Sequence, residues 1–364
     1  MHIALKRTLQ SVSLVLTLYL IIANFNTVTG ELERMAAVSA FLNTSPTTAF
    51  EYLSQNNGQI SVSASDEKIS VTEKTETEAK KSSSSESTTS KKTVTAQAEE
   101  KVKGKITDSN LSNAGANTSY KNVYFNNCTG QKISVKDFVN AEVPFKIDNS
   151  NEPQVLIYHT HATECYMNDD TDYYTESDKT RTTDKQKNIT AVGTTLANEL
   201  KSNGFSVVHD TTLHDHPSYT GSYDNSAETI KKYLKKYPSI KIIIDLHRDS
   251  ISSGENEKIA PTVTIDGKKA AQVMIVMGSN TGGIDNYPKW KSNLALASKL
   301  QQSFANMYPG LSRALLLRSS LYNQNLSTGA MLIEIGTEAN TLEEAKYSAQ
   351  LVGKSLSAVM KGLK

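Results

Sequence analysis

The chain has little cysteine and almost no net charge, and each shortage excludes a class of protein. The only cysteines among the 364 residues are Cys128 and Cys165. No framework of several disulfides can hold the fold, although a single disulfide between these two is possible. The 39 basic and 38 acidic side chains leave a formal net charge of +1. A nucleic-acid-binding protein normally carries a clear basic excess, so the balance argues against nucleic acid as a partner.

Aromatic residues are missing from the stretch between Leu53 and Ser119, which consists mostly of Ser, Thr, Lys and Glu. Such a composition cannot bury enough apolar area to offset the entropy lost on folding. We therefore expect residues 31–118 to hold a short juxtamembrane helix and then a disordered linker. A flexible coil of about 60 residues spans on the order of 40–45 Å, which suits a tether.

Long apolar runs are also scarce, and the one near the N-terminus has a distinctive setting. Lys6 and Arg7 precede a run rich in Leu, Val and Ile from about Leu9 to Phe25. Basic residues before such a run are typical of a secretory signal or a membrane anchor, and a span needs roughly 17–25 residues. Because a small-residue cleavage site is weak, we expect residues 1–30 to be an uncleaved anchor in the cell membrane, with the remainder on the extracytoplasmic side.

From residue 119 to 364 the pattern is typical of a folded catalytic domain. Apolar runs of strand length alternate with segments of helical periodicity, which predicts one α/β domain with a central, largely parallel sheet flanked by helices. The predicted strands are 155–158, 205–209, 240–246, 272–277, 313–317 and 331–335, and the predicted helices are 188–203, 225–237, 290–308 and 340–363. A hairpin at Asp266-Gly267 is predicted to join 262–265 to 272–277. Asn225 and Asn340 are predicted to open capping boxes.

Three of these strands deliver side chains that bind metals or carry protons. His161 and Glu164 follow the first strand, His247 follows the strand 240–246, and Glu334 lies inside the strand 331–335. Ligands of parallel α/β sheets bind at the carboxyl ends of the strands, so we expect these side chains to meet there.

Two imidazoles and one carboxylate predict a zinc site with one coordination position left for water. We expect His161, Glu164 and His247 to be the ligands, with His159 as the alternative histidine. Zinc lowers the pKa of its bound water towards about 7. Glu334 is the candidate acid–base residue, and the predicted reaction is amide hydrolysis.

The neighbours of His247 suggest supporting roles. Asp245 and Asp249 are expected to orient the His247 ring, and Arg248 to grip a substrate carboxylate or steady an oxyanion. Four tyrosines are candidate walls of a substrate groove: Tyr173, Tyr174, Tyr219 and Tyr223. Three further histidines lie in a polar segment and are expected to be solvent-exposed: His209, His214 and His216.

The segments Leu156–Tyr166, Ile244–Asp249 and Leu332–Thr341 resemble the stage II sporulation protein P family, which groups with zinc-dependent N-acetylmuramoyl-L-alanine amidases. The resemblance runs from about Val155 to the C-terminus. It implies a peptidoglycan hydrolase at the septal and engulfing membrane of the mother cell in endospore-forming bacteria. Cleavage of the muramic acid–L-alanine amide and of stem-peptide cross-links is implied. So are two partners, stage II sporulation protein D, a lytic transglycosylase, and stage II sporulation protein M.

The family pattern of His, Glu and His ligands with a catalytic Glu falls on His161, Glu164, His247 and Glu334. In the broader amidases the Glu ligand lies further from the first His, so Glu176 is a fallback ligand. Two other functions are compatible with the sequence, a catalytically inactive wall-binding scaffold and a metallo-carboxypeptidase.

Overall fold

The computed structural model of the chain describes residues 101–148 and 151–364. The expected anchor, the juxtamembrane helix and the linker up to residue 100 lie outside these ranges. Within the described ranges, no helix is long and apolar enough to span a membrane. Strand β1 (Val102–Ser109) lies in residues that the composition assigned to the linker. It lacks aromatic residues but pairs with a strand on each side, so the folded part begins before the expected residue 119.

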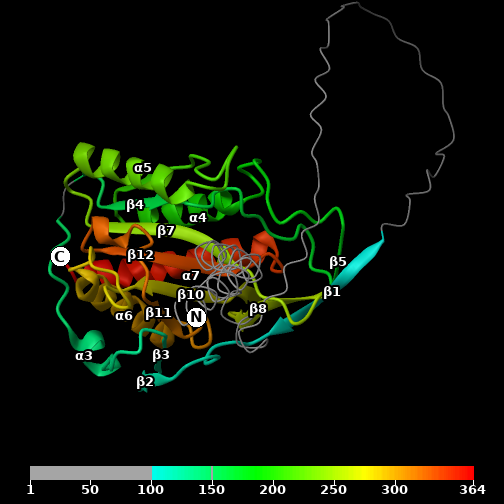
Figure 1. Ribbon diagram of the computed structural model, residues 1–364, viewed down its shortest axis with the longest axis horizontal. Coiled ribbons are helices and arrows are strands. Elements are labelled where there is room, and N and C mark those ends of the chain that lie inside the picture. The colour runs from blue at the N-terminus through cyan, green and yellow to red at the C-terminus, as the bar shows by residue number, and fades with distance from the viewer. Residues whose placement is uncertain (1–100, 149–150) are drawn as a thin grey trace, which may run out of the picture. The chain divides into compact units, whose positions relative to one another are not determined.

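The main sheet has eight strands in the order β2, β3, β11, β10, β12, β7, β4, β6 (Figure 1). Their bounds are β2 Thr118–Tyr120, β3 Val123–Asn127, β4 Val155–Tyr158, β6 Val207–His209, β7 Ile242–Asp249, β10 Val273–Gly278, β11 Leu315–Arg318 and β12 Ala330–Thr337. Strands β12, β7, β4 and β6 pair in parallel, as do β10, β11 and β3. Strand β10 is antiparallel to β12, and β2 to β3. The α/β class is confirmed, and the sheet is mixed.

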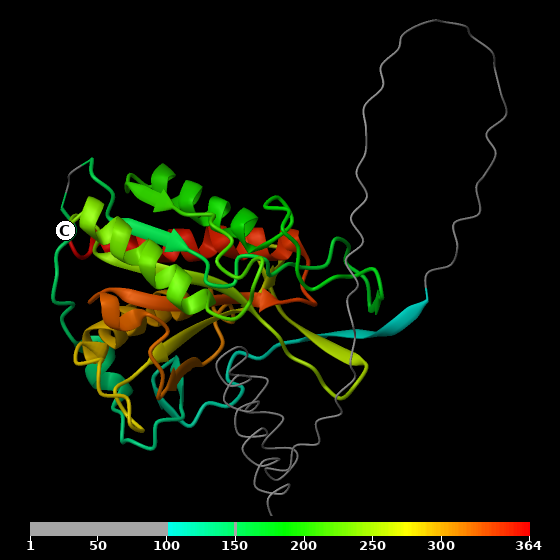
Figure 2. The same cartoon turned by 45° about the horizontal axis from the view of Figure 1, so that its top comes forward.

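Helices cover both faces of this sheet. They are α3 Val135–Asn140, α4 Ile189–Ser202, α5 Ser222–Lys236, α6 Trp290–Met307 and α7 Leu342–Lys361, with a 3₁₀ turn η1 at Gln324–Leu326. Helix α4 packs on α7, α7 on α6, and α6 on α3, which forms a row over one face. Helix α5 covers the other face, where Ile230 packs with Leu156 and Ile243. Figure 2 shows α5 and α7 on opposite sides of the strands.

A second sheet of four strands extends from one end of the main sheet (Figure 1). Its order is β5 (Tyr173–Thr175), β1, β8 (Glu257–Ile265) and β9 (Lys268–Ala271). The turn at Asp266-Gly267 joins β8 to β9, so the predicted turn is right and its predicted second strand is wrong. Gln272 lies between β9 and β10, where the chain passes from the second sheet to the main sheet. Its side chain accepts from the Leu111 N–H and donates to the Gly310 carbonyl.

Two helices begin at residues other than those predicted. Helix α5 follows Gly221, whose φ is 88°, and has no side-chain cap; Asn225 instead donates to the carbonyl of His214. Helix α7 opens with a capping box of Thr341 and Glu344, one residue beyond the predicted pair. Asn225 thus uses a tertiary partner, which local spacing does not reveal, whereas Asn340 accepts from the Thr337 N–H and donates to Glu344 Oε2.

Candidate functional site

Strand register places the candidate acid–base residue beside a candidate ligand. Glu334 on β12 is the register partner of His247 on β7, and parallel neighbours lie about 4.8 Å apart. Strand β4 flanks β7 on its other side, and His161 lies in the turn after β4. All three side chains are buried. Three separate strands thus bring these side chains to the same edge of the sheet.

The closest contacts of this group centre on His247. Its ring lies 5.2 Å from the His161 ring, measured between centroids, and nearly perpendicular to it. His247 Nδ1 is 3.5 Å from Glu164 Oε2, and His247 Nε2 is 2.9 Å from Asp245 Oδ1. Asp245 also accepts hydrogen bonds from the backbone N–H and the hydroxyl of Thr160. The structure therefore brings His161, Glu164 and His247 together and holds Asp245 against the His247 ring.

Burial and charge act differently on the members of this group. Burial lowers the pKa of His161 to about 3, so its imidazole is neutral. Burial would also lower the pKa of His247, but the charges of Asp245 and Glu164 outweigh it and raise that pKa well above its usual value. Burial, reinforced by the charge of Asp249, raises the pKa of Glu334 well above its usual value. The centre thus concentrates negative charge around a single protonated imidazole.

The donor chemistry of this centre suits a zinc ion. A neutral imidazole, a carboxylate and a second imidazole whose proton a metal would displace form a common zinc ligand set. Glu334 Oε2 is buried without a hydrogen-bond partner in the part of the chain that the structure describes. As these residues stand in the described structure, no three His, Cys, Asp or Glu side chains are arranged so that they could hold a metal ion. His161 Nε2 instead lies 3.0 Å from the Tyr219 hydroxyl, a contact that ligation through this nitrogen would replace.

The alternative histidine, His159, has both ring nitrogens in other contacts. Nδ1 lies 2.8 Å from the Leu246 carbonyl, and Nε2 lies 2.9 Å from His209 Nε2. Burial, together with the charge of His209, lowers the pKa of His159 to about 3. His214, expected to be exposed, is buried because its Nδ1 contacts the His159 carbonyl at 2.8 Å. These histidines form a separate polar cluster beside α4.

Arg248 lies behind the centre and braces it. Its backbone N–H donates to Glu164 Oε2 at 3.1 Å. Its guanidinium donates to the carbonyl oxygens of Cys165, Thr180 and Asp249 at 3.1, 2.7 and 3.1 Å. This placement differs from the predicted grip on a substrate carboxylate, because the side chain points into backbone carbonyls.

Sequence reasoning missed Arg181 and Asp215. Arg181 Nη1 is 2.8 Å from Asp215 Oδ2, and Nη2 is 3.6 Å from Glu164 Oε1. Its guanidinium lies 4.7 Å from the Tyr219 ring centroid, and that ring stacks on His161 at 4.5 Å. Both missed residues come from polar segments without periodicity, so only the fold reveals that they meet. The groove tyrosine Tyr219 does lie at the centre.

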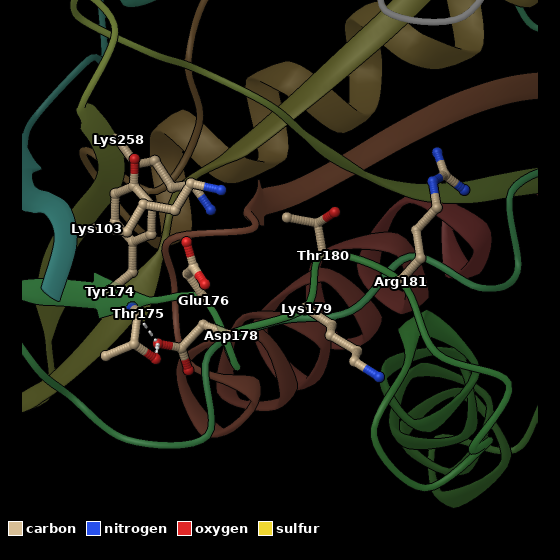
Figure 3. A pocket seen from close by; sticks show the side chains of 9 residues that line it. All are labelled: Lys103, Tyr174, Thr175, Glu176, Asp178, Lys179, Thr180, Arg181 and Lys258. Atoms are coloured by element: carbon tan, nitrogen blue, oxygen red, sulfur yellow. Dashed lines mark hydrogen bonds between the residues drawn. The ribbon is translucent and has the colours of Figure 1, made fainter. Parts of the chain in front are cut away.

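A pocket of about 450 Å³ lies beside Arg181. Figure 3 shows its lining, with Arg181 at one end and Lys103 and Lys258 close together at the other. The fallback ligand, Glu176, is exposed in this pocket. The lining residues are Lys103, Tyr174, Thr175, Glu176, Asp178, Lys179, Thr180, Arg181 and Lys258.

Comparisons with known proteins give one family and several distant structures. The profile of the family "Stage II sporulation protein P" matches residues 43–357. Stage II sporulation protein P of Bacillus subtilis (strain 168) is 32% identical over 217 residues, which are 57% of this chain and 51% of that protein. The chain therefore matches about half the length of this curated relative.

Two solved structures overlap the chain at low similarity. One is the CwlD amidase from Clostridioides difficile, solved with the GerS lipoprotein, at 11% identity and a TM-score of 0.35, covering 58% of this chain and 98% of that one. The other is the catalytic domain of CwlV, an N-acetylmuramoyl-L-alanine amidase from Bacillus (Paenibacillus) polymyxa var. colistinus. It is 16% identical, with a TM-score of 0.35, and covers 58% of this chain and 99% of that one.

Proposed function

Because the chain belongs to the stage II sporulation protein P family, we propose that it is a peptidoglycan hydrolase that acts during sporulation. It cleaves the amide between N-acetylmuramic acid and L-alanine, and also stem-peptide cross-links. The observation that carries this proposal is the meeting of His161, Glu164 and His247 beside Glu334 at one edge of the sheet. Ligand-type and acid–base side chains buried together are typical of hydrolytic sites.

In this proposal His161, Glu164 and His247 hold zinc. When bound, zinc supplies Lewis acidity, which polarises the amide carbonyl and lowers the pKa of a water molecule. Asp245 Oδ1, 2.9 Å from His247 Nε2, keeps the His247 ring facing Glu164. Arg248 fixes Glu164 through its backbone N–H. Neither of these two residues exchanges a proton with the substrate, so both are positioning residues.

Glu334 moves the proton. Its Oε2 is buried without a hydrogen-bond partner among the described residues, so this oxygen is free to receive one from the attacking water. It then delivers that proton to the leaving amine nitrogen. A raised carboxyl pKa suits such a step, because the group must be able to hold the proton at neutral pH before releasing it.

We further propose where the protein acts and with which partners. Residues 1–30 anchor it in the septal and engulfing membrane of the mother cell, and residues 31–100 link the anchor to the hydrolase domain on the extracytoplasmic side. Stage II sporulation proteins D and M are its partners. Membership of the family supports these assignments.

Loss of a single ligand tests the proposal. The purified full-length chain, supplied with zinc, is incubated with isolated peptidoglycan, and soluble fragments are measured over time. His247→Ala is expected to lose hydrolysis and zinc content together, while His216→Ala, at an exposed position, retains both. Thermal unfolding checks that both variants are folded. Full hydrolysis by folded His247→Ala contradicts the proposal, and wild-type protein with well under one zinc per chain favours a wall-binding scaffold.

A further inference from the structure

The pocket next to Arg181 is built from two neighbouring strands and the segment after a third. Lys103 lies on β1 and Lys258 on β8, which pair in parallel. Tyr174 lies on β5 and pairs with Gly104 on the other side of β1. The two lysines therefore project from the rigid sheet, and their positions do not depend on a long loop.

Close packing fixes the floor of the pocket. A Cβ atom at Gly104 would lie 2.5 Å from a carbon of the Tyr174 ring and 2.4 Å from the Asn256 carbonyl oxygen, so only glycine lets the ring approach. The Lys258 ammonium lies 4.2 Å from the centre of that ring. The ring face attracts the cation and holds Lys258 over the floor.

The charges of the pocket leave its lysines available to an anion. Four cations line it against two acids, Glu176 and Asp178. Asp178 accepts from the backbone N–H and the hydroxyl of Thr175. In the described residues no ion pair joins Glu176 to Lys103 or to Lys258. Burial lowers the pKa of Lys258; the charges of Glu338 and Asp178 oppose this shift, and those of Arg248 and Lys103 add to it. A bound anion would offset the cost of burying this ammonium group.

One residue joins this pocket to the candidate centre. Arg181 lines the pocket and contacts Glu164 at 3.6 Å. It also lies over the Tyr219 ring that stacks on His161. The strand bridge between Glu164 and Arg181 ties the two segments together. Arg181 thus lies between the candidate centre and the pocket, whose two lysines are at the other end of the lining (Figure 3).

We propose that this pocket binds a carboxylate of the peptide attached to muramic acid, with Lys103 and Lys258 as its cationic partners. The inference rests on the proposed hydrolase function, since that function places the peptide beside the centre. The peptide next to the scissile amide carries carboxylates, and two ammonium groups on a preformed surface suit such a group. The pocket would select peptides whose carboxylates are free over those in which they are amidated.

A pair of matched ligands tests the inference. Binding of N-acetylmuramoyl-L-alanyl-D-glutamate and of its diamide to the full-length, zinc-free chain is measured by titration calorimetry. The diacid is expected to bind at least about tenfold more tightly, the scale of one charge-assisted hydrogen bond. Lys103→Gln and Lys258→Gln should each remove most of this preference and leave the diamide unchanged. Lys136→Gln, at an exposed position on α3, should keep the preference.

Several results would overturn the inference. Equal affinity of the wild-type chain for diacid and diamide, absence of binding at millimolar ligand, or an unchanged preference in Lys103→Gln would each do so. Lys103 is exposed, so its variant folds even if Lys258→Gln does not. Peptidoglycan digestion by the same samples separates the two proposals. If the wild-type chain digests peptidoglycan but binds diacid and diamide equally, only the proposed carboxylate pocket is refuted. If it prefers the diacid but does not digest peptidoglycan, only the proposed hydrolase function is refuted.

Discussion

The variant Glu334→Gln should lose peptidoglycan hydrolysis and still fold. The Glu334 side chain is buried in β12, where burial first and then the charge of Asp249 raise its pKa well above the usual value. In the zinc-free protein its carboxyl group therefore carries a proton near neutral pH, and glutamine reproduces that neutral shape. The positive charge of a bound zinc ion would lower this pKa and leave the carboxylate that the hydrolytic step requires. The variant should fold normally and lose at least about 100-fold in hydrolysis, the lower end of what a positioned acid–base group contributes.

The sign of the stability change follows from the proton balance. A carboxyl group with a raised pKa in the folded state holds its proton when the unfolded chain, with a pKa of about 4.3, has lost it. Wild-type stability therefore falls as the pH rises above about 4.3, and Glu334→Gln does not share this loss. Each pH unit is worth at most about 1.4 kcal/mol. In zinc-free protein the variant should gain up to about 3 kcal/mol on the wild type between pH 5 and 7.

Glu338→Gln is the matched control, since Glu338 is also buried but lies against a cation. Its Oε1 accepts from the Ser250 hydroxyl at 2.9 Å, and its Oε2 is 3.6 Å from Arg248 Nη1. Loss of this charge should lower the free energy of unfolding by about 1–3 kcal/mol. Urea denaturation of the three proteins at pH 5, 6 and 7 provides the comparison. If Glu334→Gln is destabilised, or its difference from wild type does not change with pH, the reasoning is wrong.

Three further predictions concern the surroundings of the centre. Gly193→Ala should lower the free energy of unfolding, measured by urea denaturation, by about 1–3 kcal/mol. Alanine normally favours a helix over glycine by about 1 kcal/mol, but its Cβ here would lie 2.6 Å from His209 Nε2 and 2.7 Å from His159 Nε2. A stabilised variant would contradict this packing. Burial lowers the pKa of His209 to about 4 and that of His159 to about 3. As the pH falls below about 6.5 the unfolded chain therefore takes up protons first, and the free energy of unfolding should decrease. His209→Gln should reduce this pH dependence of stability, and an unchanged pH dependence would refute the lowered pKa of His209. Arg181→Gln leaves Asp215 without its cation and should weaken zinc binding by about 10–100-fold in a competition titration, with unchanged affinity as the contrary outcome.

Residues with strong local signals could be predicted from the sequence. The strand Val155–Tyr158 is observed as expected, and the helix expected over 188–203 is observed as Ile189–Ser202, because an apolar run and helical periodicity are local properties. The grouping of His161, Glu164 and His247 was also predicted, since parallel neighbours bring their carboxyl ends together, although His247 lies inside β7 (Ile242–Asp249) and does not follow the strand as expected. The position of Glu334 beside His247 depends on the register of β12 and β7, which the structure supplies.

Features that depend on distant contacts could not be predicted. The sequence of strand β1 has the composition of a polar linker, and the strand forms because it pairs with β5 and β8. Arg181 meets Asp215 across 34 residues of chain, in segments without periodicity. Arg248 was expected to face substrate, yet its donors reach backbone carbonyls, whose positions no spacing rule supplies.

The most direct test of the central claim is the chemistry of the products. Mass spectrometry of peptidoglycan digested by the full-length chain with zinc should detect stem peptides with a free N-terminal L-alanine and glycan strands with free muramic acid carboxyl groups. A chelator should abolish both, and added zinc should restore them. Release of single C-terminal residues without these ends, or the same products in the presence of chelator, would contradict a zinc amidase built on His161, Glu164 and His247.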